Sequence, residues 1–387
     1  MKSIPLSELV PNRYFDQPVY LDKSFLLLTP DSPVTTDLVR RLQKWKYSQV
    51  LTDGNPKDLP GYMSGTGQAG LGPQTIDQDI HETEQSGAAR AFYADFTSFA
   101  SVTFARYAAE GVLDLAEVTE WTKKAMKMVH DNRDFLLRFF DIGADGDRYL
   151  ITHAVNSTIL ALAVSDYLKT PPHRLIELGN ACLLHEIGMF KLPVELRRSS
   201  KTLTPEERNA MMTHTLLGYR VLKGFSAPEN VALAALEHHE RIDGSGYPRK
   251  LAAPKITDYA LIIGVVCSYD AMVSRRPFRP GTMDGHATIL DLAQKNRKQY
   301  DEKILKALVY TLSVYPVGTA VQLSNKSKGI VMKTDPTKPR CPIVRVVVDP
   351  EGKTIEDPQL IQVSDGQGLT ISGALSADEA KELRELA

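Results

Sequence analysis

The chain has 387 residues, and its 46 lysines and arginines nearly balance its 47 aspartates and glutamates. This balance does not indicate a partner such as nucleic acid or an anionic membrane surface. Three well-separated cysteines make no disulfide framework, the longest apolar stretch is too short for a bilayer, and no signal peptide is visible. We therefore expect a cytoplasmic protein of several domains that neither binds nucleic acid nor inserts into a membrane.

The first part of the chain, residues 1–55, predicts a small α/β module. Strand-like runs at 18–21, 25–28 and 48–51 surround a segment with helical periodicity at 36–46. Residues 56–88 follow and are rich in Gly, Pro, Gln, Asp and Ser. Because this composition is typical of a linker, we expect 56–88 to connect the module to the rest of the chain.

Residues 89–145 predict a helical segment because aromatic side chains recur there at mostly helical spacings. These residues are Phe92, Phe96, Phe99, Phe104 and Tyr107. Two roles stay open for the aromatic stripe: packing in the protein's own core, or forming the seam of a homodimer between helices.

The next part, residues 146–314, contains five of the nine histidines: His153, His185, His214, His238 and His239. Each lies in a segment with helical periodicity. A lone histidine on an apolar helix face is usually a core residue with one hydrogen bond. Five on successive helices would each carry a desolvation cost, which convergence on metal ions would offset.

The adjacent pair His238 and His239 is the strongest single signal. It ends the apolar run 231–236 and leads through Glu240 and Asp243 into a Gly-rich turn that ends at Tyr247. Glycine accepts the positive φ of a tight reversal, so this turn can close over whatever the histidines hold. The plain alternative is a solvated histidine pair at a helix end. Glu240 and Asp243 are either partners of the ligands or simple turn residues.

The sequence also predicts two further helix starts and a change from helical to strand-like periodicity. Thr204, Pro205 and Glu207 predict a capped helix that carries His214. After residue 315 the apolar residues alternate, which predicts a small β appendage over 315–387. We expect this appendage to end in a short helix at 376–386, with Ser376 as its cap.

The order of these motifs resembles the HD-GYP domain, a branch of the HD superfamily of metal-dependent phosphohydrolases. The resemblance runs from about 147 to 315 and rests on His153, on the His-Glu-Ile-Gly sequence at 185–188, on His214, on HHERIDGSGYP at 238–248, and on the segments 269–272 and 276–280. It implies a multi-domain, mainly α protein. An all-helical HD-GYP domain would be flanked by the small N-terminal α/β module and the small C-terminal β appendage.

The resemblance also implies an activity: hydrolysis of cyclic di-GMP to pGpG or GMP by two divalent transition-metal ions. Iron is the expected metal, with manganese or zinc as alternatives. The implied metal ligands are His153, His185, Glu186, His214, His238, His239 and Cys267. Glu186 and His185 are the implied catalytic residues, and Tyr247, Arg276, Arg279 and Lys191 the implied ligand-binding residues. For the two arginines, a solvated basic loop is the alternative.

Several positions depart from the family pattern. Glu186 stands where the family has an aspartate, which moves the carboxylate outward by one methylene. Cys267 replaces a later aspartate ligand. A thiolate there would favour iron or zinc over manganese or magnesium, although a buried apolar cysteine is an alternative. Met189 replaces a lysine, for which Lys191 is the nearest substitute, and Tyr149 replaces the glutamate of three-metal members.

Three functions remain open. The first is a phosphodiesterase slowed by these substitutions, and the second is a catalytically degenerate domain that still binds metal and senses cyclic di-GMP for a signalling partner. The third is a scaffold with a vestigial site. Because all five histidines are present, we expect metal binding to be retained and the slow enzyme to be the better hypothesis.

Overall fold

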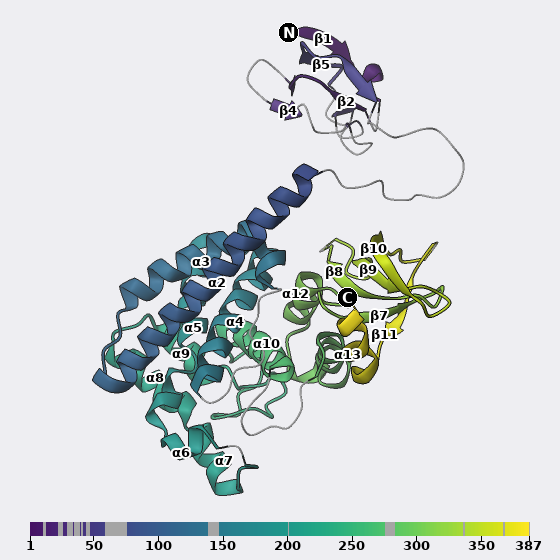
Figure 1. The fold of residues 1–387 in the computed structure, drawn as a ribbon. Helices are drawn as coiled ribbons and strands as arrows, with labels where there is room; N and C mark the ends of the chain where they lie inside the picture. The colour runs from purple at the N-terminus through teal and green to yellow at the C-terminus, as the bar shows by residue number, and fades with distance from the viewer. Residues whose placement is uncertain are drawn as a thin grey trace. The chain divides into compact units, whose positions relative to one another are not determined.

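The structure is a computed structural model (Figure 1). It describes all residues except 11–12, 22–25, 29–33, 35–38, 40–41, 44–46, 59–75, 138–146, 200, 275–282, 336, 367 and 387. The chain divides into two compact units, Met1–Gln74 and Thr75–Ala387, and each is described by itself.

The first unit is a small β-rich module. Its elements are β1 (Lys2–Pro5), η1 (Leu6–Glu8), β2 (Arg13–Phe15), β3 (Val19–Tyr20), β4 (Leu26–Leu28), β5 (Gln49–Thr52) and β6 (Pro56–Asp58). One antiparallel sheet has the order β1-β5-β3-β4, and β2 pairs with β6. The three strands predicted from the sequence are thus confirmed. Most of the helix predicted at 36–46 lies outside the described residues.

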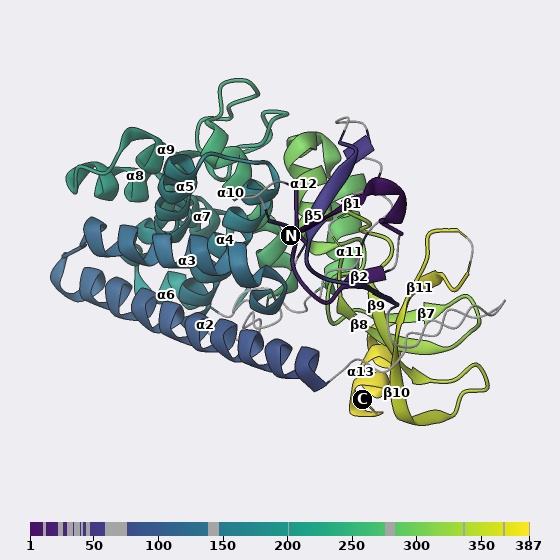
Figure 2. The same ribbon diagram turned by 90° about the horizontal axis from the view of Figure 1, so that it is seen from above.

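The second unit begins with two long helices, α2 (Ile76–Glu110) and α3 (Leu115–Leu136), which lie side by side (Figure 2). Helix α2 starts inside the predicted linker, so the expectation of a linker up to residue 88 is corrected there. Acidic residues such as Asp77, Asp79 and Glu82 favour the N-terminus of a helix. The same polar sequence has no apolar stripe, and its composition therefore predicts a linker although the residues form a helix.

The remaining helices form one domain with α2 and α3. They are α4 (Asp147–Tyr167), α5 (Pro172–Leu184), η2 (Ile187–Lys191), α6 (Val194–Arg197), α7 (Pro205–Met212), α8 (His214–Gly224), α9 (Glu229–Glu237), α10 (Asp258–Val273), α11 (Gly285–Leu290), η3 (Asp291–Lys295), η4 (Arg297–Gln299) and α12 (Glu302–Leu312). The predicted capping box is confirmed, since Thr204 accepts the N–H of Glu207 while Glu207 accepts the N–H of Thr204. The expectation that this helix carries His214 is corrected, because α7 ends at Met212 and His214 begins α8.

A large hydrophobic core runs through this domain from Ala89 to Leu312, and a smaller cluster contains Tyr149, Leu150, Met189 and Leu192. The aromatic residues of α2 are buried in the large core, and Phe96 and Phe104 are fully enclosed. Burying each such side chain is worth about 1.5–3 kcal/mol, so the aromatic stripe is core. Helix α10 is apolar on nearly every side, which places it at the centre of the domain against α4, α5, α9 and α12.

The C-terminal part is a five-stranded antiparallel sheet, as the alternating pattern predicts. Its strands are β7 (Ala320–Leu323), β8 (Lys328–Lys333), β9 (Ile343–Val348), β10 (Thr354–Gln362) and β11 (Ile371–Ala374), in the order β10-β9-β8-β7-β11. Helix α13 (Ala377–Leu386) covers one face through Leu383. Ser376 caps this helix by accepting the N–H of Glu379. Within the described residues, every helix is too short or too polar to cross a bilayer.

Candidate metal centre

Seven side chains of the second unit meet in two groups. His153, His185 and Cys267 form the first group, and Glu186, His214, His238 and His239 form the second. Within each group the potential ligand atoms all lie within 4.8 Å of one another. All seven are the residues that the resemblance implied as metal ligands, so the structure brings that whole set together.

Helix ends position three of the imidazoles. His185 and His238 follow the last residues of α5 and α9, and His214 follows the end of α7. The last carbonyls of a helix have no partner within it. Each of these rings uses such a carbonyl three residues back. Nδ1 of His185 lies 2.5 Å from the oxygen of Cys182, Nδ1 of His214 lies 2.8 Å from that of Met211, and Nδ1 of His238 lies 3.0 Å from that of Ala235.

His153, in the middle of α4, is oriented by a side chain instead. Its Nδ1 lies 2.6 Å from Oδ2 of Asp270, which is fully buried on α10. In all four rings Nδ1 faces an oxygen, which leaves Nε2 directed toward the other members of the site. Partners of this kind fix the tautomer and direction of histidines that bind metals.

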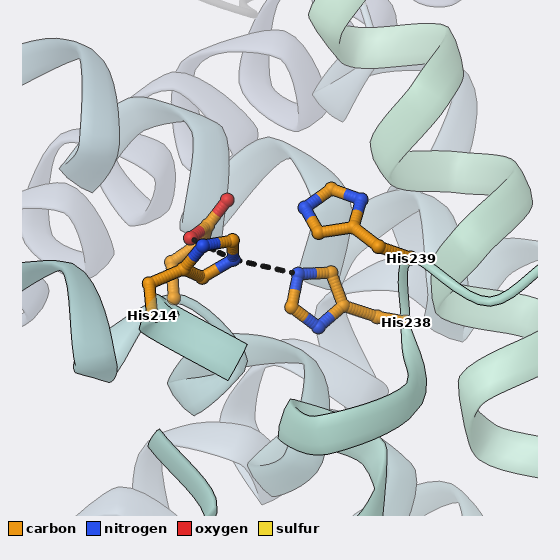
Figure 3. Close-up of side chains that lie close together, drawn as sticks. His214, His238 and His239 are labelled. Atoms are coloured by element: carbon orange, nitrogen blue, oxygen red, sulfur yellow. Dashed lines mark hydrogen bonds and ion pairs between the residues drawn. The ribbon is translucent and has the colours of Figure 1, made fainter. Parts of the chain in front are cut away.

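The ring nitrogens and carboxylate oxygens that face the centre of the site are poorly satisfied by other protein groups. Nε2 of His214 and Nε2 of His238 face each other at 3.4 Å, with His239 beside them (Figure 3). Two bare nitrogens at this separation repel each other unless a proton or a cation lies between them. Nε2 of His185 and Oε2 of Glu186 are buried without a hydrogen-bond partner. Buried polar atoms are rarely left unpaired, so these residues fit divalent metal ions.

The ionisation of the second group is also suited to a cation. Burial alone would raise the pKa of Glu186, but the imidazoles around it, foremost His214, lower it to about 2. Burial lowers the pKa of His238 and of His239 well below the usual value, and neighbouring histidines add to this effect. At neutral pH Glu186 is therefore a carboxylate, and His238 and His239 are neutral rings, which are the forms that bind metal.

In the first group the thiolate of Cys267 carries the negative charge. Sγ of Cys267 lies 3.3 Å from Nε2 of His153. Burial alone would raise the pKa of Cys267, but the neighbouring His153, followed by His185, lowers it to about 6. Burial opposes a charge on His153, whereas Tyr149, Cys267 and Asp270 raise its pKa, and the net effect is a pKa well above the usual value. Cys267 also belongs to the buried hydrophobic core, so its role as a ligand stays a prediction.

A cavity of about 440 Å³ opens beside the metal centre. Its lining combines donor atoms with apolar walls: Tyr149, Leu150, Glu186, Met189, Arg197, Thr202, Leu203, Arg208, Met211, Met212, His214, His239, Tyr247 and Cys267. Two arginines, Arg197 and Arg208, are thus among the residues that line the cavity, and a guanidinium group is suited to an anionic ligand. We did not single out either arginine from the sequence, because α6 and α7 carry no motif that distinguishes them from ordinary surface residues.

The Gly-rich turn lies over the second group, as expected. Tyr247 lines the cavity, and its ring stacks on His239 with 4.7 Å between the centroids. Gly244 adopts a φ of +78°. A Cβ on Gly246 would come within 2.4 Å of the oxygen of His239, so only glycine fits there. Glu240 holds the loop by accepting the N–H groups of Arg249 and Leu251.

Three residues that we expected to bind the ligand are not found at the cavity: one lies elsewhere, and two lie outside the described residues. Lys191 is not among the cavity residues, and its Nζ lies 5.1 Å from the ring centre of Tyr107 on α2. It ends a 3₁₀ turn in which Met189 faces the cavity, and residues two apart point in different directions there. The expectation for Lys191 is therefore corrected. Arg276 and Arg279 lie outside the described residues.

Two buried residues that hold the ligands were not predicted as site residues. Asp270 orients His153, and Nδ2 of Asn156 donates to Oδ1 of Asp270 over 2.9 Å. The signal for Asp270 was present, since it lies three residues after Cys267 and so on the same face of a helix. Asn156 gives no such signal, because its role depends on the packing of α4 against α10.

Comparison with known proteins agrees with this geometry. The family model "HD domain" matches residues 140–304, and the model "KOW domain associated with HD domain" matches residues 320–383. Residues 140–304 are thus similar to the HD domain family. The metal-ligand candidates, from His153 to Cys267, all lie within the matched range.

Several curated relatives of this chain are named cyclic di-GMP phosphodiesterases. One from Borreliella burgdorferi is 26% identical over 57% of this chain and 58% of its own length. One from Pseudomonas aeruginosa is 32% identical over 56% of this chain and 52% of its own, and one from Thermotoga maritima is 45% identical over 27% and 28%. The alignments thus span little more than half of these relatives at most.

Proposed function

We propose that the protein is a metal-dependent phosphodiesterase that hydrolyses cyclic di-GMP to pGpG or GMP. The observation that carries the proposal is the pair of adjacent residues His185 and Glu186, which belong to different ligand groups beside one cavity. Two linked groups at the mouth of a cavity suit the cleavage of a phosphodiester. The names of the relatives point to cyclic di-GMP as the substrate.

In this proposal His153, His185 and Cys267 hold one cation, and Glu186, His214, His238 and His239 hold the other. When bound, two divalent cations neutralise charge on the phosphate oxygens and lower the pKa of a water molecule for in-line attack. Iron is the proposed metal, with manganese or zinc as alternatives, because imidazole and thiolate ligands favour iron and zinc.

The protein's own residues supply position and charge. Oε2 of Glu186, which lies 3.3 Å from Nε2 of His214, is the acceptor that orients the attacking water. Arg197 and Arg208 contact phosphate oxygens, for which the planar guanidinium is suited. The ring of Tyr247 and the methionines of the wall, such as Met189 and Met211, exclude water around the bases. Arg276 and Arg279 remain predictions as further phosphate contacts.

We further propose that turnover is slow. Glutamate carries its carboxylate one methylene farther than the aspartate for which such a site is built, and a displacement of about 1 Å can reduce a rate about 100-fold. The alternative is a sensor that binds metal and cyclic di-GMP without cleaving it and passes the signal to a protein partner. A homodimer through α2 would need residues other than the aromatic ones, because these are buried in the chain's own core. A cytoplasmic location also remains a prediction.

The test is an assay of anaerobically purified, iron-reconstituted protein with cyclic di-GMP, in which pGpG and GMP are separated by chromatography. We expect slow formation of pGpG or GMP that the double variant His238→Ala/His239→Ala abolishes. Binding of cyclic di-GMP by calorimetry without any product would support the sensor instead. Neither binding nor cleavage would contradict both proposals.

A further inference from the structure

We propose that Tyr93 on α2 is a positioning residue for the metal centre. It acts through Asn156 and Asp270 on the ring of His153. The inference rests on the proposed metal centre and deepens it, since it adds a residue that is remote from the ligands and lies on a helix outside the stretch that contains them.

The link is a continuous chain of buried hydrogen bonds. The hydroxyl of Tyr93 donates to Oδ1 of Asn156 over 2.8 Å, and Nδ2 of Asn156 donates to Oδ1 of Asp270 over 2.9 Å. Oδ2 of Asp270 lies 2.6 Å from Nδ1 of His153. The four side chains belong to α2, α4 and α10, and none is more than 8% exposed.

The orientation of each side chain in this series of hydrogen bonds depends on the hydrogen bond before it. The donor of Tyr93 holds the amide of Asn156 so that its NH₂ group, and not its oxygen, faces the carboxylate. Because Asn156 holds Oδ1 of Asp270, Oδ2 stays directed at His153. The hydroxyl of Ser274 makes a longer contact of 3.4 Å with Oδ1. In a water-free interior such bonds reinforce one another, so the direction of Nε2 of His153 depends on Tyr93.

Tyr93 lies on α2, the helix that follows the first compact unit in the sequence. Helix α2 begins at Ile76, directly after the first compact unit ends at Gln74. A movement of α2 along α4 would lengthen the bond between Tyr93 and Asn156. The ligand group that contains Cys267 is thereby connected to the helix that leaves the N-terminal unit.

The test compares Tyr93→Phe with Tyr107→Phe, a matched control that removes a hydroxyl from another buried tyrosine of α2. Tyr107 contacts Lys191 and not the chain of hydrogen bonds. The dissociation constant for cobalt(II) is measured by competition with a chromophoric chelator, together with the visible spectrum, which reports ligand geometry. We expect about tenfold weaker binding and an altered spectrum for Tyr93→Phe, at the lower end of the effect of such outer partners. Tyr107→Phe should match wild type.

A double-variant comparison separates positioning from a general loss of stability. In an Asp270→Ala background, adding Tyr93→Phe should weaken cobalt binding no further, because the link through Asp270 to His153 is gone. Asn156→Ser breaks the same link from the other side and serves if Tyr93→Phe does not fold. Equal cobalt affinity in wild type and Tyr93→Phe, or equal losses in both tyrosine variants, would overturn the link alone. Wild type that binds no cobalt would overturn the metal centre and the link together.

Discussion

Sγ of Cys267 lies 3.3 Å from Nε2 of His153 at the centre of the helical domain. The two groups of donor atoms therefore differ in chemistry, since one contains a thiol and the other a carboxylate. A thiolate ligand favours zinc or iron, whereas carboxylates suit manganese and magnesium. The metal preference of the protein should thus depend on residue 267 more than on any histidine.

Cys267→Asp should shift the metal preference toward manganese. We expect about tenfold tighter binding of Mn²⁺ and about tenfold weaker binding of Zn²⁺, magnitudes typical of changes at a metal site. Chelator competition with each metal measures both constants, with Cys267→Ala as the control that removes the ligand without replacing it. Unchanged constants in both variants would return Cys267 to the role of a core residue.

The protein should purify with about two transition-metal ions per chain, as a two-metal site requires. His238→Ala/His239→Ala should remove the ion of the second group and weaken the first. His173→Ala, on the exposed side of α5, is the matched control and should leave the metal content unchanged. Elemental analysis measures the content, and circular dichroism checks that the variants stay folded. Less than about half an ion per chain in reconstituted wild type would contradict the two-metal site.

Glu186→Asp should increase turnover of cyclic di-GMP about tenfold or more when both forms are fully loaded with metal. The substitution keeps the charge and withdraws the carboxylate by about 1 Å, toward the position that a site built around aspartate requires. Initial rates of product formation at saturating substrate measure the effect. A slower Glu186→Asp would mean that the site has adapted to glutamate.

Arg208→Met should raise KM for cyclic di-GMP about tenfold with little change in kcat, if Arg208 contacts a phosphate that does not react. The loss of one hydrogen bond to a charged group corresponds to about 1.5–3 kcal/mol. Arg220→Met on α8 provides the control, because Arg220 is exposed and does not line the cavity. The same KM in both variants and wild type would exclude Arg208 from the binding site.

Cys267→Ala should lower the pKa of His153 in metal-free protein. The thiolate stabilises the charged imidazole, and its removal leaves burial, which disfavours the charge, with less opposition. A lower pKa means that the ring gives up its proton at a more acidic pH. An NMR titration of the imidazole resonances measures the shift. An unchanged or higher pKa would show that Asp270 and not Cys267 holds the proton on His153.

Local patterns were enough to predict several elements and most of the site. The capping box at Thr204 and the helix cap at Ser376 depend on residues three positions apart, and both are confirmed. The five histidines were recognised because imidazoles on apolar helix faces are costly unless something binds them. The start of α2 was missed because a polar helix lacks the apolar periodicity on which the prediction relied.

The sequence by itself therefore determined the class of the domain, its candidate ligands and the chemistry of each, because these depend on residue types and on spacings along one helix or turn. Only the tertiary structure decided how the ligands divide into two groups. It also decided that Lys191 faces α2, that Arg197 and Arg208 line the cavity, and that Tyr93 reaches His153. These relationships join residues that are distant in sequence. They follow from the way in which α2, α4 and α10 pack, and no spacing along the chain encodes that packing.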